Sequence, residues 1–437
     1  MKRYLYLFYL AILGPCLEAE NLNDLSMSQM EFINFKERLI TSVETHPEAL
    51  LQDSLVSQKV YDLDIVKSRY RPNVSFISSS KTPINSQSDS FFQSIQRKQH
   101  RTIDKSLVFE NLVTDFGRTK SLISQEESNV SSLKALNLSE KSKLVLRALD
   151  ACMDTAVYSL AYLANQSSVL RLEEISNLIK VRVNAGRAPG REESRANARL
   201  SEGKAREILT SSKLSESEAR FKALLPSVNF CRKLPLAEFY IEMDLTKSVL
   251  AAKTNNLEMQ AYLFKLESLE NQVSFIKRDK FPTITAQVRA DQFDITNSED
   301  YELYGGFNLN WDIYQGDRRQ IQEKKANEEI RAATYERTAF ERELESLVAA
   351  SLADLINSED RLKAFQEAYK ANEESSQQLK AQFFSANVSL LDLLQSERDL
   401  LDSTEALILN SKEVAMKRFI HLYYLGELTK EFNIENG

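Results

Sequence analysis

The sequence contains few residues that interrupt a helix. Glycine occurs 10 times and proline 8 times in 437 residues, well below their usual frequencies in globular proteins. Neither occurs between residues 119 and 185 or between residues 318 and 385. Two such stretches predict two long helices. Each would be about 100 Å long, which is too long for one globular core, so it must pack against neighbours along its length.

Other features are also scarce, and their scarcity excludes several classes of protein. The net charge is −7, so no basic surface for nucleic acid is expected. The three histidines, His46, His100 and His421, have no partner at metal-ligand spacing and are interpreted as surface or packing residues. No phosphate-binding loop, nucleophile elbow or CxxC pair occurs. The sequence therefore predicts no enzyme, no cofactor and no metal site.

The beginning of the chain has the pattern of a secretory signal. Lys2 and Arg3 precede an apolar run at residues 4–13, which is too short to span a bilayer as a helix. We expect residues 1–19 to be this signal, with cleavage after Ala19. Cys16 leaves lipid attachment as an alternative, although Pro15 stands where a small residue is expected.

Only two cysteines follow the signal, Cys152 and Cys231. In an exported protein they can form one disulfide, but not a disulfide framework. No later stretch has 18 consecutive apolar residues. If the exported chain enters a membrane, it must therefore do so with β-strands, because only helices and closed barrels satisfy the backbone there.

The chain repeats itself at an offset of about 200 residues. The stretch NLVTDFGR at 111–118 aligns with WDIYQGDR at 311–318, and the stretch around Gly186 aligns with that around Ala386 at the same offset. Pro72 aligns with Pro282 at an offset of 210. Three matches in the same order indicate a duplicated unit. The predicted parts are a first repeat at 20–225, a connecting segment at 226–246 and a second repeat at 247–437.

Both repeats have the same predicted plan. A helix-like segment, at about 27–70 and 247–280, ends at a proline, which cannot continue a helix. Two strand-like segments follow, at about 73–113 and 283–313, and a helical hairpin completes each repeat, at about 119–225 and 318–425. The expected fold class is mainly helical with a small β part.

The last strand-like segment has the clearest alternation. YELYGGFNLNWDIY, at 301–314, alternates apolar or aromatic residues with polar ones, which is typical of a strand with one apolar face. Two hairpins of a soluble domain would explain the pattern. It also fits membrane strands whose aromatic residues lie at the boundary with water. In that case the predicted girdle, the ring of aromatic side chains at that boundary, consists of Tyr301, Phe307, Trp311 and Tyr314.

The returning helix of the second repeat carries a heptad pattern. Apolar residues recur every seven positions in two adjacent stripes, one formed by Leu394, Leu401, Ile408, Ala415 and Leu422 and the other by Leu393, Leu400, Leu407 and Val414. Sustained heptads predict coiled-coil packing, here on a face wide enough to touch two neighbours.

The turns of the two helical hairpins lie far along the chain from the strands. Gly186, Pro189 and Gly190 occur within five residues of each other and predict the first reversal. Asn387 and Ser389 are the turn-forming residues at the equivalent place in the second repeat.

These features in this order resemble the TolC family of outer-membrane channel proteins. The resemblance covers nearly everything after the signal. It is carried by ETHPEAL, by RYRPNVSF and RDKFPTIT, by TDFGR and IYQGDRR, by AGRAPGREE and by HLYYLGEL. SLLDLLQSERDLLDS is especially similar to members that serve type I secretion.

The resemblance implies a homotrimer in the outer membrane. Four strands from each of three chains would form a twelve-stranded barrel, continued by a helical barrel across the periplasm. If the strands are embedded in the membrane, physical reasoning also requires assembly, because four strands leave open edges that lipid cannot satisfy. Three chains leave room for a lumen. Such a channel exports polypeptide or small molecules with a periplasmic adaptor and an inner-membrane transporter. The alternative is a periplasmic coiled-coil adaptor or structural protein without a pore.

The resemblance also implies an acidic constriction at the hairpin tips. Asp392 matches the first aspartate of that constriction, and Gln395 stands where some members have a second. Glu192 is the equivalent acid of the first repeat, with Arg195 about one turn later. Val388 occupies a position where some relatives carry a gating arginine. A ring of carboxylates would favour cations. Alternatively, Glu192 and Asp392 simply complement the dipoles of their helices.

Overall fold

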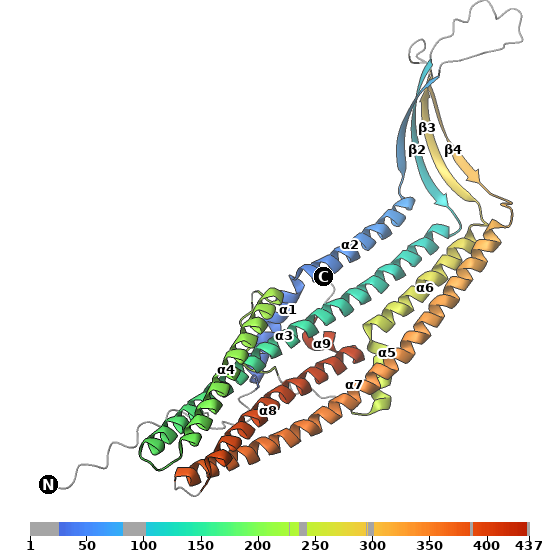
Figure 1. The fold of residues 1–437 in the computed structure, drawn as a ribbon. Coiled ribbons are helices and arrows are strands. Elements are labelled where there is room, and N and C mark those ends of the chain that lie inside the picture. Colours follow the sequence, from blue (N-terminus) through green and yellow to red (C-terminus); the bar gives the residue numbers. More distant parts are fainter. Residues whose placement is uncertain are drawn as a thin grey trace, which may run out of the picture. The chain divides into compact units, whose positions relative to one another are not determined.

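A computed structural model describes residues 26–434, apart from 82–101, 227, 236–242, 294, 296–300 and 385–387. The predicted signal at 1–19, with Cys16, lies outside the described residues. The elements, drawn in Figure 1, are α1 (Gln29–Glu44), α2 (Pro47–Lys67), η2 (Ser68–Tyr70), β1 (Asn73–Lys81), β2 (Thr102–Thr114), α3 (Arg118–Asn184), α4 (Gly190–Leu224), α5 (Leu245–Asn255), α6 (Leu257–Arg278), β3 (Thr283–Gln292), β4 (Tyr301–Asn310), α7 (Arg318–Phe384), α8 (Leu390–Leu425) and α9 (Leu428–Phe432).

The same succession of elements occurs twice along the chain. Two helices lead into two strands, which lead into one long helix and a shorter returning helix. The two long helices, α3 and α7, have 67 residues each. The predicted fold class, mainly helical with a small antiparallel sheet, is confirmed by this arrangement.

The helix that begins each repeat is interrupted, which the sequence prediction missed. Instead of one helix at 27–70 there are two, and Pro47 is the first residue of the second. Proline is tolerated there because the first turn needs no amide hydrogen bond. In the second repeat α5 ends before Asn256, whose side chain accepts the backbone N–H of Met259 at 3.0 Å. This amide caps the next helix without glycine or proline at the break.

The chain divides into two compact units. The first comprises the described residues up to Asp53, residues 137–259 and residues from 341 onward, and it contains both hairpin turns. The second comprises residues 54–136 and 260–340 and contains the four strands.

The sheet of the second unit is antiparallel throughout, in the order β1-β2-β3-β4. Residues directly opposite each other share a face, so the register defines two faces. One face is mostly apolar and carries Val74, Phe76, Leu107, Phe109, Ile284, Val288, Leu303, Phe307 and Leu309. The other is mostly polar and carries Ser75, Ser106, Glu110, Thr285, Gln287, Arg289, Asp291, Glu302 and Asn308. Each face has exceptions: polar Ser78, Ser80, Lys105, Asn111 and Gln292 lie on the apolar face, and Ile77, Val108, Leu112 and Tyr304 lie on the polar face.

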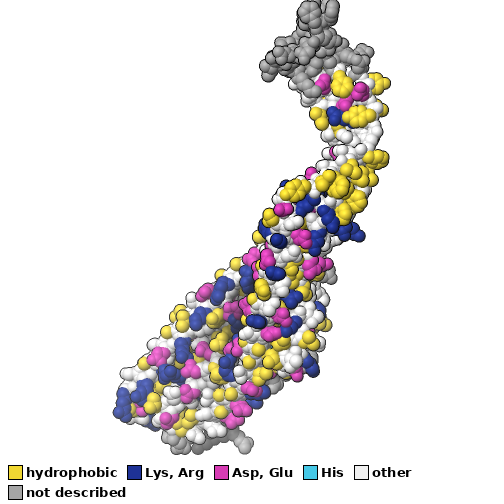
Figure 2. Space-filling model, turned by 90° about the vertical axis from the view of Figure 1, so that its right-hand side faces the viewer, with side chains coloured by type: hydrophobic (Ala, Val, Ile, Leu, Met, Phe, Trp, Pro, Cys, Tyr) yellow, Lys and Arg dark blue, Asp and Glu magenta, His cyan; other side chains and the backbone are white. Residues whose placement is uncertain are grey.

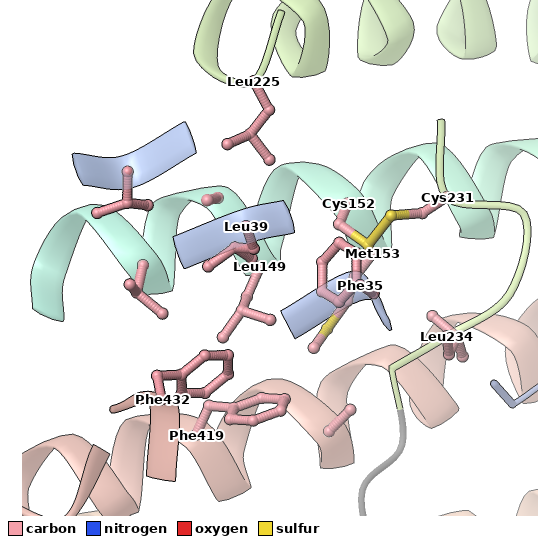
Figure 3. Packing of buried hydrophobic residues seen from close by; sticks show 14 of the residues in the cluster. Phe35, Leu39, Leu149, Cys152, Met153, Leu225, Cys231, Leu234, Phe419 and Phe432 are labelled. Carbon is pink, nitrogen blue, oxygen red and sulfur yellow. A yellow bond between two sulfur atoms is a disulfide. The ribbon is translucent and has the colours of Figure 1, made fainter. Parts of the chain in front are cut away.

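The core of the first unit gathers segments that are distant in sequence. Phe35 and Leu39 of α1 pack with Leu149 of α3, Phe419 of α8 and Phe432 of α9, as Figure 3 shows. Burial of such side chains is the main favourable contribution to folding. Helix α1 is therefore packed against the long helix α3 of the first repeat and against α8 and α9 at the end of the second.

A disulfide forms part of this core. The sulfur atoms of Cys152, in α3, and Cys231, in the segment after α4, are bonded across 79 residues of sequence, and both cysteines are buried. The sequence left this pairing open. The bond fastens the described part of the connecting segment to the long helix.

The heptad stripes of α8 face the interior, as predicted. Eight of their nine residues are buried, and Leu400 is half-buried. Two neighbouring stripes can be buried together only if the helix has neighbours on a wide face. At the end near the second turn, Leu393 and Leu394 join Leu172, Ile179 and Phe383 in a second apolar cluster.

Candidate functional site

The first hairpin turn is formed by the residues predicted for it. Gly186 has φ 69°, in the left-handed region that glycine adopts readily. Its N–H donates to the carbonyl of Val183 at 2.9 Å. Pro189 is the N-cap of α4, and Gly190 is the first residue of that helix. The reversal therefore combines a glycine that ends one helix with a proline that precedes the next.

The acidic residue of this turn lies in the first turn of α4. Glu192 is half-buried, and its N–H donates to the carbonyl of Pro189 at 3.0 Å. Arg195 is exposed about one turn later. A carboxylate at this position also complements the positive end of the helix dipole.

The second turn is capped by a side chain. Asn387 lies outside the described residues, and Val388 is half-buried. Ser389 is the N-cap of α8: its hydroxyl oxygen accepts the N–H of Asp392 at 3.2 Å, and its O–H donates to Oδ2 of Asp392 at 2.7 Å. Within one chain, Asp392 therefore helps to cap the start of α8. Its side chain is nevertheless exposed to solvent. Gln395 is exposed and donates to Asp399 at 2.8 Å.

The four residues predicted for the constriction do not contact one another within one chain. Among the residues that the structure describes, no hydrogen bond or ion pair joins Glu192 or Arg195 to Asp392 or Gln395. A constriction built from these residues would require several copies of the chain, so it stays a prediction.

The two hairpins are nevertheless joined close to their turns. The guanidinium of Arg182, in α3, stacks 4.6 Å from the ring centroid of Phe383, in α7, and donates to its carbonyl at 3.1 Å. Lys380 of α7 lies 2.8 Å from Glu174 of α3. With the apolar cluster around Leu393, these contacts hold the ends of the long helices together.

A buried carboxylate lies among these contacts between the two hairpins. Glu397, in α8, is only 2% exposed. It accepts Nε of Arg171 from α3 at 2.6 Å and the hydroxyl of Ser376 from α7 at 3.0 Å. Three helices therefore meet at one side chain. Sequence reasoning did not single out Glu397, because nothing local distinguishes it from other acids of the heptad region.

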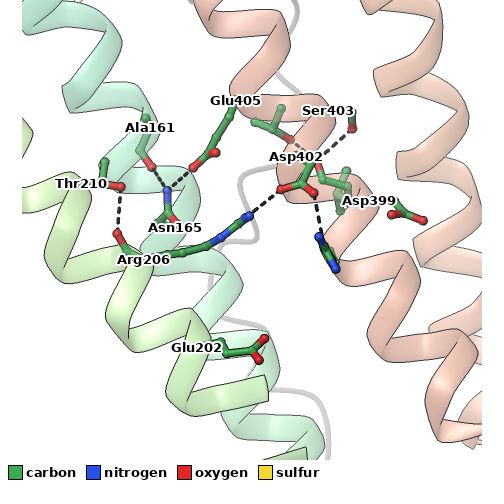
Figure 4. Close-up of polar contacts among 12 residues, drawn as sticks. Ala161, Asn165, Glu202, Arg206, Thr210, Asp399, Asp402, Ser403 and Glu405 are labelled. Atoms are coloured by element: carbon green, nitrogen blue, oxygen red, sulfur yellow. Dashed lines mark hydrogen bonds and ion pairs between the residues drawn. The ribbon is translucent and has the colours of Figure 1, made fainter. Parts of the chain in front are cut away.

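Further polar contacts continue along α8, as Figure 4 shows. Arg206 of α4 donates to Asp402 of α8 at 2.7 Å, and this hydrogen bond raises the pKa of the Arg206 guanidinium above its ordinary value. Asn165 of α3 donates to Glu405 at 2.6 Å. Lys412 lies within 2.7 Å of Asp150 and Asp154. These pairs and the contacts around Glu397 are called the inter-hairpin seam below.

The predicted girdle residues are exposed in the second unit. Tyr301, Phe307 and Tyr314 are each 78% exposed and Trp311 is 52% exposed. β4 ends at Asn310, so Trp311 and Tyr314 follow the strand rather than belong to it. The indole N–H of Trp311 donates to the carbonyl of Lys280 at 3.1 Å. Figure 2 shows hydrophobic side chains gathered at the base of the sheet on the face of β4 and α7.

Two further features are absent from the described residues. No described helix has an apolar stretch long enough to cross a membrane. No group of three or more histidine, cysteine, aspartate or glutamate side chains among those residues is placed to hold a metal ion.

Comparison with known families identifies the second repeat. Residues 249–418 match the family model for the outer membrane efflux protein. These residues belong to the outer membrane efflux protein family. The resemblance to the TolC family and the expected place in the outer membrane are confirmed by this match together with the fold. Since the family consists of channel proteins, the prediction that the chain is not an enzyme is confirmed as well.

Solved structures of several outer-membrane proteins have the same fold. The outer-membrane channel OprN is 15% identical, with a TM-score of 0.75, and the similarity covers 91% of each chain. The CmeC outer membrane channel of Campylobacter jejuni is 12% identical, with a TM-score of 0.75 over 90% of this chain and 86% of CmeC. VceC of Vibrio cholerae is 14% identical, with a TM-score of 0.73 over 91% of this chain and 98% of VceC. No curated protein matches the sequence.

Proposed function

We propose that this outer-membrane efflux family protein is the exit channel of a tripartite export system. It would pass secreted polypeptide or small molecules from an inner-membrane transporter to the exterior. The observation that carries the proposal is the four-stranded sheet, whose two faces differ in polarity. Its outer strands, β1 and β4, each pair with only one strand among the described residues.

Open strand edges favour assembly of several copies. In lipid, each unpaired backbone group costs several kcal/mol, so β4 of one copy must pair with β1 of another. Closure with three copies gives twelve strands, enough to surround a lumen. The apolar face, with Phe76 and Phe307, would face lipid, and the polar face, with Arg289 and Asp291, would line the passage.

The hairpin turns have a separate role in the proposal. In a trimer, Asp392, Gln395, Glu192 and Arg195 would surround a constriction in the periplasm. The turn residues would contact the periplasmic adaptor; they are Gly186, Pro189, Gly190, Asn387 and Ser389. The inter-hairpin seam holds the two hairpins of each chain together, so both turns of a chain would lie at the same end of the assembly.

The experiment is the conductance of the purified protein in a planar bilayer. The parent should form a pore that prefers cations, and Asp392→Ala should lower that preference because it removes one carboxylate per chain. Asp360→Ala is the matched control, since Asp360 is an exposed aspartate of α7 paired with Lys363 at 3.0 Å. An unchanged preference in Asp392→Ala would remove that residue from the constriction. Absence of any conductance would favour the alternative of a coiled-coil adaptor without a pore.

The class of cargo is tested in cells. If the cargo is polypeptide, deletion of the protein should retain a secreted protein inside the cell and leave sensitivity to toxic small molecules unchanged. If the cargo is small molecules, the deletion should raise that sensitivity and leave secretion intact.

A further inference from the structure

A pocket lies where the sheet meets the helices of the second unit. Its volume is about 500 Å³, and it is formed by the end of α6, the residues after β4 and the start of α7. Four cationic side chains line it, Lys277, Lys280, Arg318 and Arg319. Only two carboxylates, Asp317 and Glu323, line it with them. The lining therefore has an excess of positive charge.

Two of the four cations have no acidic partner. Lys277 lies 3.5 Å from Glu323, and Arg319 lies 3.3 Å from Asp279. Lys280 and Arg318, by contrast, form no ion pair among the described residues. Arg318 donates to the amide oxygen of Gln315 at 2.6 Å, which leaves further N–H groups of its guanidinium for an anion.

Apolar side chains also line the pocket. Ile313 and Tyr314 line it with exposures of 76% and 78%. Just before them, Trp311 is held against the backbone of Lys280 by its indole hydrogen bond. These residues continue the exposed apolar surface of β4, which includes Phe307 and Leu309. Figure 2 shows lysine and arginine side chains next to the hydrophobic side chains on this face.

We propose that this pocket binds the phosphate-bearing headgroup of an anionic phospholipid. The phosphate would bind Lys280 and Arg318, because arginine presents two parallel N–H donors to phosphate oxygens. The acyl chains would lie along Trp311, Ile313 and the apolar face of β4. Aromatic residues at a membrane boundary with adjacent basic residues are the arrangement that favours lipid headgroups. The inference rests on the proposed function, since it requires the strands to be in lipid.

The single tryptophan of the chain is a local probe for the test. Full-length protein would be reconstituted in vesicles that contain brominated phosphatidylglycerol or brominated phosphatidylcholine over the same range of mole fractions. Bromine quenches indole fluorescence at short range, so quenching of Trp311 reports the lipid at the pocket. We expect half-maximal quenching at a several-fold lower fraction of phosphatidylglycerol. A basic side chain near an anionic surface changes lipid association by about fivefold, so Lys280→Gln with Arg318→Gln should abolish the preference.

The control removes two equivalent charges elsewhere on α7. Lys325→Gln with Arg331→Gln should leave the preference unchanged, because both side chains are exposed and paired with Glu329 and Glu328. Lys280→Gln alone should lower the preference for phosphatidylglycerol about fivefold. It leaves no carboxylate unpaired, so it replaces the double variant in the test if that variant misfolds.

The outcomes separate this inference from the proposed function. Equal quenching by both lipids in the parent would overturn the lipid site while the strands remain in the membrane. Binding of inorganic phosphate to the parent but not to the double variant, with no difference between the two lipids, would also overturn it, since the pocket would then bind free phosphate. If a neighbouring copy of the chain fills the pocket, neither brominated lipid would quench Trp311 although the protein conducts ions. Absence of both quenching and conductance would contradict the proposed function instead.

Discussion

At the scale of single residues, Glu397 shows how polar groups are accommodated between the hairpins. A charge that is almost completely buried is tolerated only with a partner and hydrogen bonds. Arg171 and Ser376 supply both, from two different helices. The same two contacts also make the packing of the three helices specific, because a shift of any of them along its neighbours would break at least one contact.

Loss of the Glu397 carboxylate should therefore destabilise the protein. Glu397→Ala leaves Arg171 largely buried without its partner, and we expect the free energy of unfolding to fall by about 3 kcal/mol. Thermal unfolding of the purified protein measures the change. Glu202→Ala is the control, because Glu202 pairs with Arg199 at 2.5 Å on the surface and is 63% exposed. An effect of Glu202→Ala as large as that of Glu397→Ala would contradict this explanation.

The buried imidazole of His421 predicts sensitivity to acid. Nδ1 lies 2.8 Å from the hydroxyl of Ser351, and Nε2 has no hydrogen-bond partner among the described residues. Burial lowers the pKa of His421 below its ordinary value of 6.5. The unfolded chain then binds the proton more tightly than the folded one, so stability is full above pH 6.5 and is lost as the pH falls below it.

The expected loss is about 1.4 kcal/mol for each pH unit below 6.5, until the lowered pKa of the folded protein is reached. Melting temperatures at pH 7.5 and pH 5.5 test this expectation, and the decrease should be smaller in His421→Gln than in the parent. His46→Gln should retain the full decrease, because His46 is only half-buried and lies at a helix start. The same decrease in all three proteins would show that other groups cause the acid sensitivity.

At the scale of elements, the sequence predicted the buried or apolar face of a helix or strand wherever one spacing of apolar residues persisted along it. Sevenfold spacing predicted which face of α8 is buried, and twofold spacing predicted the apolar face of β4 with Phe307. The break at Asn256 was missed, because an asparagine that caps a helix looks like any other polar residue of the pattern. Arg171 and Glu397 could not be paired in advance, since they are 226 residues apart and only the packing of three helices brings them together.

The disulfide is the element-scale feature with the largest expected effect. It joins α3 to the connecting segment across 79 residues, and a loop of that length corresponds to about 4.5 kcal/mol in the chain-entropy treatment. Reduction should lower the melting temperature of the parent. Cys152→Ser with Cys231→Ser should melt at the lower temperature with or without reductant. A parent that is insensitive to reductant under conditions where both thiols can be labelled would contradict a stabilising role.

At the scale of the whole molecule, the sheet separates two roles by face. The register places Phe307 opposite Ala286 and Asn308 opposite Thr285, so two adjacent residues of β4 point to opposite sides. β4 is also one of the two edge strands. In the proposed trimer a change at either residue is repeated three times around the barrel. Phe307 and Asn308 therefore test which face of the sheet contacts lipid, because the two residues differ in face but hardly in position along the strand.

Phe307→Arg and Asn308→Arg should have different consequences. A cation on the lipid side costs about 2–4 kcal/mol per chain at the middle of the bilayer and up to about 1 kcal/mol near its boundary. Phe307→Arg should therefore reduce the amount of trimer in the outer-membrane fraction, measured by migration of unheated and heated samples on gels. Asn308→Arg places the same charge in the passage, where water solvates it. It should assemble normally and lower the cation preference of the conductance. Normal assembly of Phe307→Arg together with failure of Asn308→Arg would mean that the polar face is the one in contact with lipid, and that the apolar face lines the interior.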